Sequence, residues 1–349
     1  MTPSAASEAQ DAAGQTLRRI AYLLERARAT PYRSEAFRGA ARAVEACDPT
    51  RFGLLASSGR LRDLPGVGEK TAGVVDAVLR GDPVEYLERL EREAVATPPS
   101  GPAAALRAAL RGDLHSHTEA SDGVSPLPEM VAAAIDLGHD YLAVTDHSPR
   151  LTIAHGLSPA RLRAQLDQIA ALNAALDAAD SSFRVLSGIE VDILEDGSLD
   201  QEPDLLAELD VVVASVHSLL RMESGPMTRR LLTALADPNT DVLGHCTGRQ
   251  LTGKLRPPST FDRHAVFAAC AEHAVAVEIN CRPDRLDPPH ALLQTAIDAG
   301  CLFSIDTDAH APGQLDWQAA GCDRAAAHDL APERVVNTWP LERLLAWHR

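Results

Sequence analysis

The sequence predicts an α/β fold: a β/α barrel of seven parallel strands, preceded by a small all-helical domain. Three observations predict it. Beyond residue 110, short apolar segments alternate with helical stretches at a spacing typical of right-handed parallel crossovers. Most of the apolar segments end in a histidine or an acidic residue, as at the mouth of a β/α barrel. Residues 15–96 show only helical patterns and are separated from the rest by a Pro-rich stretch.

The amino-terminal part is expected to hold a short polar tail and a compact helical domain. Residues 1–14 are small and polar, and we expect them to be disordered. The helical domain is placed at residues 15–96, because apolar residues recur there at helical spacing. Residues 97–110, which begin Thr-Pro-Pro-Ser-Gly-Pro, are expected to be a linker. The helices are predicted at residues 17–29, 34–46, 52–58, 73–80 and 82–96.

A glycine-rich turn joins two of these helices. Residues 64–72 read Leu-Pro-Gly66-Val67-Gly68-Glu-Lys70-Thr-Ala. Glycines allow a backbone to approach a ligand closely, and the start of the next helix offers unpaired N–H groups to a phosphate. The string resembles the helix-hairpin-helix motif, which binds a nucleic-acid backbone without reading its sequence. The alternative is an ordinary turn between packed helices.

The barrel is expected over residues 111–349, with its first strand near Leu114. The six further strands are predicted at residues 141–145, 183–189, 210–216, 241–244, 275–279 and 302–307, and the helices between them at 126–137, 159–178, 226–236, 261–272, 288–299 and 315–327. Because the carboxyl ends of parallel barrel strands meet at one rim, side chains that follow these strands should converge.

The polar residues at these ends are of metal-binding types. His115 and His117 stand two apart, so a strand would aim both imidazoles at one face, and Asp122 follows in a turn. Six of the 13 histidines fall at strand ends. Imidazole and carboxylate together suit manganese, zinc or iron better than magnesium or calcium. The nine candidate ligands are His115, His117, Asp122, His147, Glu190, His217, His245, Asp308 and His310.

Nine ligands exceed what one ion needs, so the sequence predicts two or three divalent ions, with Glu190 as the bridge. Such ions suit phosphoester hydrolysis, in which a metal-bound hydroxide attacks the phosphorus. Glu190, Asp308 and His310 would then carry catalysis through the ions they hold. Arg249 is a candidate phosphate clamp and catalytic residue, or else an arginine of a surface loop. Asn280 either lines the substrate pocket or ties down its loop.

Composition sets further limits. A hydrophobic content of 45% without a long apolar run argues against a membrane protein. The amino end lacks the features of a signal peptide, and the six cysteines form no CxxC pair, so we expect a cytoplasmic protein with free thiols. The net charge of −16 lies entirely beyond residue 100 and would weaken binding of nucleic acid to the barrel itself. Oligomeric state is left open.

The motifs at the strand ends resemble those of the PHP (polymerase and histidinol phosphatase) phosphoesterases over roughly residues 111–340. They are Asp-Leu-His115-Ser-His117-Thr, Thr-Asp-His147, Gly-Ile-Glu190-Val-Asp, Ser-Val-His217-Ser, Gly-His245-Cys-Thr-Gly-Arg and Asp308-Ala-His310. Within that family, residues 148–173, 278–287 and 336–338 most resemble the PHP domain of bacterial family X DNA polymerases. Residues 15–95 resemble the helix-hairpin-helix domain of the same polymerases, through Pro31-Tyr-Arg-Ser-Glu-Ala-Phe-Arg-Gly-Ala-Ala and Leu-Pro-Gly-Val-Gly. Too few residues separate the two parts to hold a polymerase core.

The resemblance implies a distorted (β/α)₇ TIM-like barrel with three ions. One ion would be held by His115, His117, Glu190 and Asp308, a second by Glu190, His217 and His245, and a third by Asp122, His147 and His310. It also implies a DNA partner, bound through Gly66, Val67, Gly68 and Lys70, and manganese-dependent cleavage at DNA 3′ ends. Val74 stands where related domains carry a lyase lysine, so sugar-phosphate lyase activity is not expected.

Three functions are consistent with these features. The first is a metal-dependent DNA phosphoesterase: a 3′–5′ exonuclease, a 3′-phosphatase or an abasic-site endonuclease. The second is a small-molecule phosphatase of the histidinol-phosphatase type, for which the amino-terminal domain has no evident use. The third is a non-catalytic DNA-binding protein, which the complete set of candidate ligands argues against.

Overall fold

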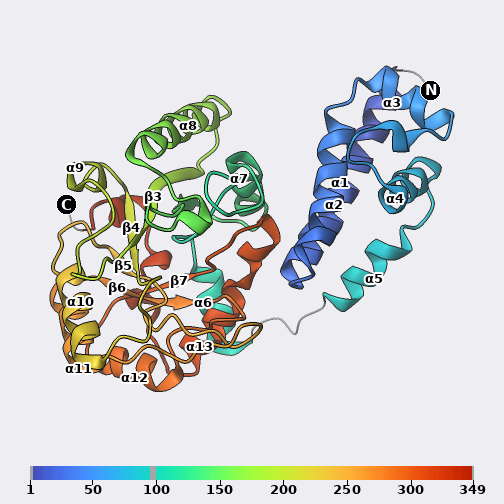
Figure 1. The fold of residues 1–349 in the computed structure, drawn as a ribbon. Coiled ribbons are helices and arrows are strands. Elements are labelled where there is room, and N and C mark those ends of the chain that lie inside the picture. The colour runs from blue at the N-terminus through green and yellow to red at the C-terminus, as the bar shows by residue number, and fades with distance from the viewer. Residues whose placement is uncertain (1–2, 95–99, 348–349) are drawn as a thin grey trace. The chain divides into compact units, whose positions relative to one another are not determined.

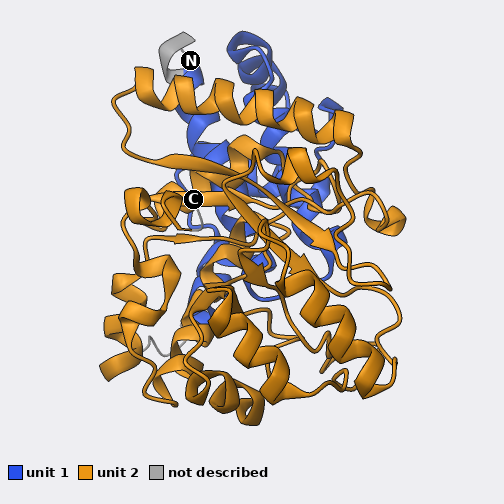
Figure 2. Ribbon diagram, turned by 90° about the vertical axis from the view of Figure 1, so that its left-hand side faces the viewer, with its two compact units in different colours: residues 1–98 blue, residues 99–349 orange. Residues whose placement is uncertain are grey.

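The computed structural model describes residues 3–94 and 100–347, and the chain divides into two compact units, Met1–Pro98 and Pro99–Arg349 (Figures 1 and 2). The first unit is helical and the second contains the whole β-sheet (Figure 1). Each unit has a hydrophobic core of its own. The predicted division into a helical domain and a barrel is therefore observed. The helical domain was predicted at residues 15–96, and in the structure both its start and its end differ from these positions.

The first unit is built from α1 (Pro3–Arg26), α2 (Pro31–Glu45), α3 (Pro49–Ser57), η1 (Leu61–Asp63), α4 (Glu69–Arg80) and α5 (Glu85–Glu93). Leu17, Ile20 and Leu24 recur on one face of α1 and are fully buried. They belong to one core with Phe37 and Val44 of α2. The helical periodicity of the sequence therefore reports a real apolar interface.

The disorder expected for residues 1–14 is wrong for the part that the structure describes. Helix α1 begins at Pro3, and Ala13 is fully buried. The amide Nε2 of Gln10 donates to the carbonyl oxygens of Val44 and Cys47, at 2.5 and 2.7 Å. A polar, alanine-rich composition suggested a free tail, yet small side chains also let this helix lie close to α2. Residues 1 and 2 lie outside the described chain.

The second unit contains one seven-stranded parallel sheet in the order β1-β2-β3-β4-β5-β6-β7, as the sequence predicted. Parallel neighbours in chain order require a crossover after every strand, which is the wiring of a β/α barrel. The strands are β1 (Gly112–Asp113), β2 (Tyr141–Val144), β3 (Arg184–Asp192), β4 (Val211–Ser215), β5 (Val242–Leu243), β6 (Ala276–Asn280) and β7 (Phe303–Asp306).

Helices lie around the sheet; α6 precedes β1, and the others come after it in the chain (Figure 1). They are α6 (Gly101–Ala109), α7 (Leu127–Asp136), α8 (Pro159–Ala178), α9 (Pro203–Leu206), α10 (Ser224–Leu235), α11 (Arg263–Glu272), α12 (His290–Asp298), α13 (Gln318–Ala326) and α14 (Leu341–Leu345), with short 3₁₀ turns η2 (Thr152–Ala154), η3 (Pro312–Trp317), η4 (Pro332–Arg334) and η5 (Val336–Thr338). All six helices predicted in this part of the chain are present.

The linker expected at residues 97–110 is wrong from residue 101 onward. Those residues form α6, which packs against α13 and buries Ala103 and Leu106. The richness in proline and glycine suggested a flexible segment, but Pro102 lies in the first turn of α6, where its missing N–H costs nothing. The boundary between the units therefore lies near Pro98, and residues 97–99 of the expected linker lie outside the described chain.

Buried carboxylates join the first and last strands of the barrel. Asp113 accepts hydrogen bonds from the backbone N–H and the hydroxyl of Thr307, and Asp306 accepts from the backbone N–H of Leu114 at 2.8 Å. Ser116 and Ala309 then form an isolated parallel bridge. Burial, together with repulsion from the nearby Asp306 carboxylate, raises the pKa of the Asp113 carboxyl. These bonds hold His115 and Asp308 at the same rim.

Candidate metal centre

The nine predicted ligands converge at the carboxyl ends of the strands. His115 and His117 follow β1, His147 follows β2, His217 follows β4 and His245 follows β5. Glu190 lies within β3, and Asp308 and His310 follow β7. Asp122 comes from the loop between β1 and α7. Positions this far apart in the chain meet because parallel strands all end at one rim.

Glu190 is the centre of the cluster. Its side chain is 1% exposed, and five imidazoles face it. From Oε1, the Nε2 atoms of His245 and His217 lie 2.8 and 3.2 Å away; from Oε2, His147 Nδ1, His115 Nε2 and His117 Nε2 lie at 2.8, 3.4 and 3.6 Å. Burial alone would raise the pKa of Glu190, but His217, His115 and His147 outweigh it and hold that pKa well below its usual range.

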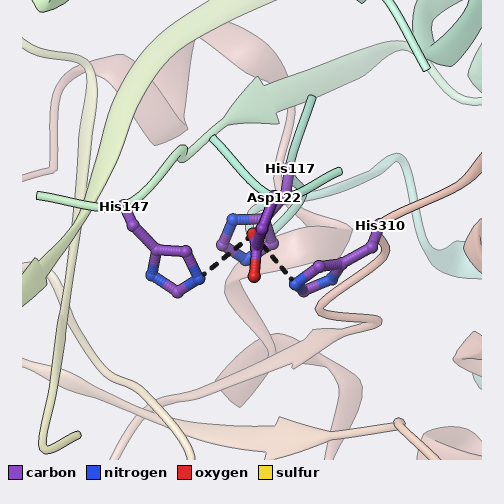
Figure 3. Close-up of side chains that lie close together, drawn as sticks. All are labelled: His117, Asp122, His147 and His310. Atoms are coloured by element: carbon purple, nitrogen blue, oxygen red, sulfur yellow. Dashed lines mark ion pairs between the residues drawn. The ribbon is translucent and has the colours of Figure 1, made fainter. Parts of the chain in front are cut away.

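Asp122 is the centre of a second group, drawn in Figure 3. Its Oδ1 lies 3.4 Å from His147 Nε2 and 3.3 Å from His310 Nε2, and the close-up shows the His117 ring beside the same carboxylate. One ligand atom from each of these four residues lies within 4.8 Å of the others. Burial, with His310 and His147 beside it, lowers the pKa of His117 to about 3, so its imidazole is neutral, the form that binds a metal.

The residues present fit divalent cations. Besides the Asp122 group, one potential ligand atom from each of His115, His117 and Glu190 converges in the same way, as do those of His147, Glu190 and His217. Within the described chain, the Nε2 atoms of His115, His117 and His217 and the Oε2 atom of Glu190 are buried without a hydrogen-bond partner. Buried polar atoms seldom lack a hydrogen-bond partner, and a group of them that does is typical of a site that binds an ion or a ligand.

Two arginines face Asp308. The guanidinium of Arg282 lies 3.4 Å from Asp308 Oδ1 and 2.9 Å from His310 Nδ1, and Arg285 Nε lies 3.2 Å from Asp308 Oδ2. Burial would raise the pKa of Asp308, but Arg282 leads the groups that lower it well below the usual range. Asp308 has a φ of +53°, in the left-handed region that aspartate adopts more readily than most residues other than glycine.

A pocket of about 560 Å³ opens over the cluster. That volume is within the range of sites for small molecules. One side is apolar and is formed by Leu151, Ile153 and Ala154 in the segment between β2 and α8, where Ile153 is 87% exposed. The polar lining residues are Asp122, His147, His217, Gln250, Arg282, Asp284, Arg285, Asp308 and His310.

Of the two roles considered for Arg249, the structure favours a loop arginine over a phosphate clamp. Its Nε donates to the carbonyl oxygen of Arg285 at 2.8 Å, its Nη2 donates to that of Leu286, and it does not line the pocket. Arg249 therefore shapes the loop after β6, whereas Arg282 and Arg285 of that loop reach the pocket. The signal available in the sequence was their position after a strand end, the same signal that identified the histidines.

Asn280 also holds the loop and does not line the pocket. Its side chain is fully buried, its Nδ2 donates to Glu278 and to Asp308 Oδ2, and its Oδ1 accepts from the backbone N–H of Arg282. Of the two roles considered for it, the structure favours tying down the loop. Its contact with Asp308 makes it a neighbour of the centre without direct access to a substrate.

Two acidic residues behind the ligands escaped the sequence reasoning. Glu278 lies 2.6 Å from His115 Nδ1, and Asp192 accepts from the backbone N–H of His217 at 3.1 Å. Both stand two residues from a site residue on the same strand, Asn280 and Glu190, so alternation places them on the same face. That alternation was the one signal that could have found them.

In the first unit, the glycine-rich turn has the expected backbone. Gly66 has a φ of +88°, Val67 is buried, and Gly68 caps α4. Lys70 is exposed and its Nζ lies 3.7 Å from the centre of the Tyr86 ring. Val74, which the family resemblance places where related domains carry a lyase lysine, is buried in the core of the unit. The valine side chain is a hydrocarbon and has no amine that could form a Schiff base.

Comparison with known proteins finds a matching domain family for each of the two units. The PHP domain model matches residues 113–263, and a helix-hairpin-helix domain model matches residues 10–82. The chain is 38% identical to the DNA polymerase/3′-5′ exonuclease PolX of Bacillus subtilis over 238 residues, which are 68% of this chain and 41% of that protein. The chain thus spans less than half the length of PolX.

A shorter relative is matched over most of its length. The chain is 30% identical to a probable phosphatase of Edwardsiella ictaluri over 240 residues, 65% of this chain and 90% of that protein. A crystal structure of histidinol phosphate phosphatase from Lactococcus lactis, complexed with zinc, L-histidinol and phosphate, covers 63% of this chain and 94% of its own, at 17% identity and a TM-score of 0.45.

None of the helices among the described residues has both the length and the apolar character needed to span a membrane.

Proposed function

Because the chain belongs to the PHP family of phosphoesterases and is a hydrolase, we propose that it cleaves phosphoesters of DNA, at 3′ ends or at abasic sites. The observation that carries this proposal is the presence, in one chain, of a barrel that matches the PHP domain and has groups of potential metal ligands at its rim, and of a unit that matches the helix-hairpin-helix domain. A phosphatase of small metabolites has no evident need for the helical first unit. The relative PolX is named as an exonuclease.

The cluster would hold two or three divalent cations. The ion sets are those that the family resemblance implies: His115, His117, Glu190 and Asp308; Glu190, His217 and His245; Asp122, His147 and His310. Mixed imidazole and carboxylate donors favour manganese, zinc or iron. When bound, such cations supply Lewis acidity that activates water and neutralises charge on the phosphoryl group. Glu190 faces ligands of all three sets and is the proposed bridge.

Arg282 and Arg285 are proposed to hold the phosphoryl oxygens of the substrate. Both line the pocket, and both lie against Asp308. A planar guanidinium binds two phosphate oxygens at once and keeps its charge at any working pH. In the first unit, Gly66, Val67, Gly68 and Lys70 are proposed to contact the DNA backbone, with Lys70 supplying the positive charge.

A panel of substrates tests the proposal. Manganese-loaded protein should release phosphate or nucleotides from DNA with a 3′-phosphate, a recessed 3′ end or an abasic site, and Asp308→Ala should abolish the release. Lys70→Ala should weaken DNA binding a few-fold and reduce its salt dependence by about one counterion. Hydrolysis of a small phosphoester by Lys70→Ala should stay unchanged, because that residue belongs to the other unit.

A second function is supported by one observation. The Edwardsiella relative is named as a probable phosphatase, and this chain covers 90% of it. If the metal-loaded protein hydrolyses histidinol phosphate or a similar monoester and leaves every DNA end intact, that function replaces the first.

A further inference from the structure

Glu278 lies beneath the metal centre and contacts two of its ligands. It belongs to β6, which contributes none of the nine predicted ligands, and it is fully buried. Its Oε1 lies 2.6 Å from His115 Nδ1. Its Oε2 accepts from the backbone N–H of His245 at 2.5 Å and from Asn280 Nδ2 at 3.2 Å. One carboxylate therefore joins residues that follow β1 and β5, the latter being the strand next to β6.

The partners of Glu278 determine which nitrogen of His115 carries the proton. The backbone N–H of His245 and the amide of Asn280 can only donate, so the carboxylate acts as an acceptor toward them. An acceptor facing Nδ1 of His115 requires that Nδ1 carries a hydrogen. In the neutral imidazole, the form that binds a metal, the lone pair of His115 is then on Nε2, which lies 3.4 Å from Glu190 Oε2 and has no hydrogen-bond partner among the described residues.

We propose that Glu278 is a positioning residue for the metal centre: it holds His115 in the tautomer whose Nε2 can bind a cation, and it fixes the backbone that carries His245. A carboxylate behind a metal-binding histidine is a general device for orienting the ring and increasing its basicity. The proposal rests on the metal centre of the proposed function, but not on the identity of the substrate.

The influence of Glu278 extends to a third strand. Asn280 Nδ2 contacts both Glu278 Oε2 and Asp308 Oδ2, at 3.2 and 3.3 Å. Ligands that follow β1, β5 and β7 are therefore linked through two side chains of β6. This explains why the only polar residues within β6 are Glu278 and Asn280, both of which point to the ligand side, although neither is a predicted ligand.

The substitution Glu278→Gln tests the proposal with almost no change in shape. An amide has one acceptor and one donor end, so it cannot accept from His115 Nδ1 and from the backbone N–H of His245 at the same time. We expect manganese or zinc affinity to fall by about 10- to 100-fold, with fewer ions retained per chain after dialysis. Titration with the metal alone and elemental analysis measure both quantities.

Asp287→Asn is the matched control. Asp287 is equally buried, lies in the loop after β6 and accepts from the N–H and the hydroxyl of Thr247, but contacts no ligand ring. This variant should keep its metal affinity. If both variants lose the same affinity, or if Glu278→Gln retains the native affinity and ion count, Glu278 is a structural residue only and the proposal fails.

The native chain provides a second test that does not depend on whether the variant folds. In the zinc-loaded full-length protein, nitrogen-15 NMR of the histidine rings should show the His115 proton on Nδ1, with the signal assigned through its absence in His115→Asn. A proton on Nε2 overturns the proposal. Failure of the proposed function would look different, because the metal results would stand while no DNA end is cleaved.

Discussion

Two clusters of buried charge, one in each unit, differ in how completely their polar atoms are paired. In the helical unit, Arg38 and Glu25 are each 4% exposed, and the guanidinium donates to both carboxylate oxygens at 2.6 to 2.8 Å. In the barrel, Glu190 is just as buried, yet it faces five imidazoles, several of whose nitrogens have no hydrogen-bond partner in the described chain.

The difference distinguishes a structural contact from a site. A buried ion pair is tolerated when hydrogen bonds satisfy both partners, and it then needs nothing further. A buried group of histidines and acids whose donor atoms point at one another is incomplete without a ligand. Substitutions in the first cluster should therefore alter the stability of the fold, whereas substitutions in the second should alter metal binding and activity.

The largest effect is expected for Glu190→Gln. The change keeps the shape of the side chain and removes the charge that all five imidazoles face, so hydrolysis of a phosphoester should fall by roughly 10³-fold or more. Steady-state kinetics and the metal content per chain measure it. The same change in the other cluster, Glu25→Gln, should leave hydrolysis of a small phosphoester unchanged. A Glu190→Gln protein within tenfold of native activity would contradict the comparison.

A smaller effect, this time on stability, is expected for Arg38→Ala. It leaves the Glu25 carboxylate buried without its guanidinium, which should lower the free energy of unfolding of the helical unit by about 3–5 kcal/mol. Urea unfolding of the full chain with a chelator present measures the change. Arg18→Ala is the control, because its ion pair with Glu45 is one-third exposed and should cost at most about 1 kcal/mol. Equal losses would show that burial does not matter here.

The smallest effect concerns His139, a buried histidine in neither cluster. It is 6% exposed, and burial, with Arg107 nearby, lowers its pKa to about 4. Below pH 6.5 the unfolded chain takes up a proton that the folded chain refuses until about pH 4, so stability falls as the pH falls through this range. The size is about 3 kcal/mol.

His139→Leu should remove that part of the pH dependence. Unfolding free energies measured by urea at pH 6.5, 5.5 and 4.5 should fall less steeply in the variant than in the native chain. His264→Leu, at an exposed position of α11, is the control and should leave the slope unchanged. If the native and His139→Leu curves run parallel, His139 accepts its proton in the folded state.

The metal-binding types of residue could be identified from the sequence because their positions follow from a short-range rule. An apolar segment predicts a buried strand, and the residue after it lies at the rim whatever the rest of the barrel does. His147, His217 and His245 were found in this way, and the structure brings all three to within 3.2 Å of Glu190. The seven strands and their parallel order were predicted from the alternation of apolar segments with helical stretches, and the structure confirms both.

Other features depend on contacts that no local pattern contains. Arg249 and Arg285 are both arginines near a strand end, and only the path of the loop after β6 turns the first toward backbone carbonyl oxygens and the second toward Asp308. Likewise, composition suggested that α6 and the start of α1 were flexible. These helices are stabilised by packing against other parts of the chain, which composition does not report.

The sequence by itself thus determined the barrel, the helical unit before it and the set of candidate ligands, since strand alternation and helix periodicity are properties of neighbouring residues. Only the tertiary structure decided which buried polar atoms pair with one another and which have no hydrogen-bond partner and can bind a ligand. That decision depends on the directions of side chains from several strands at once, as it does for Glu278 beneath His115 and His245.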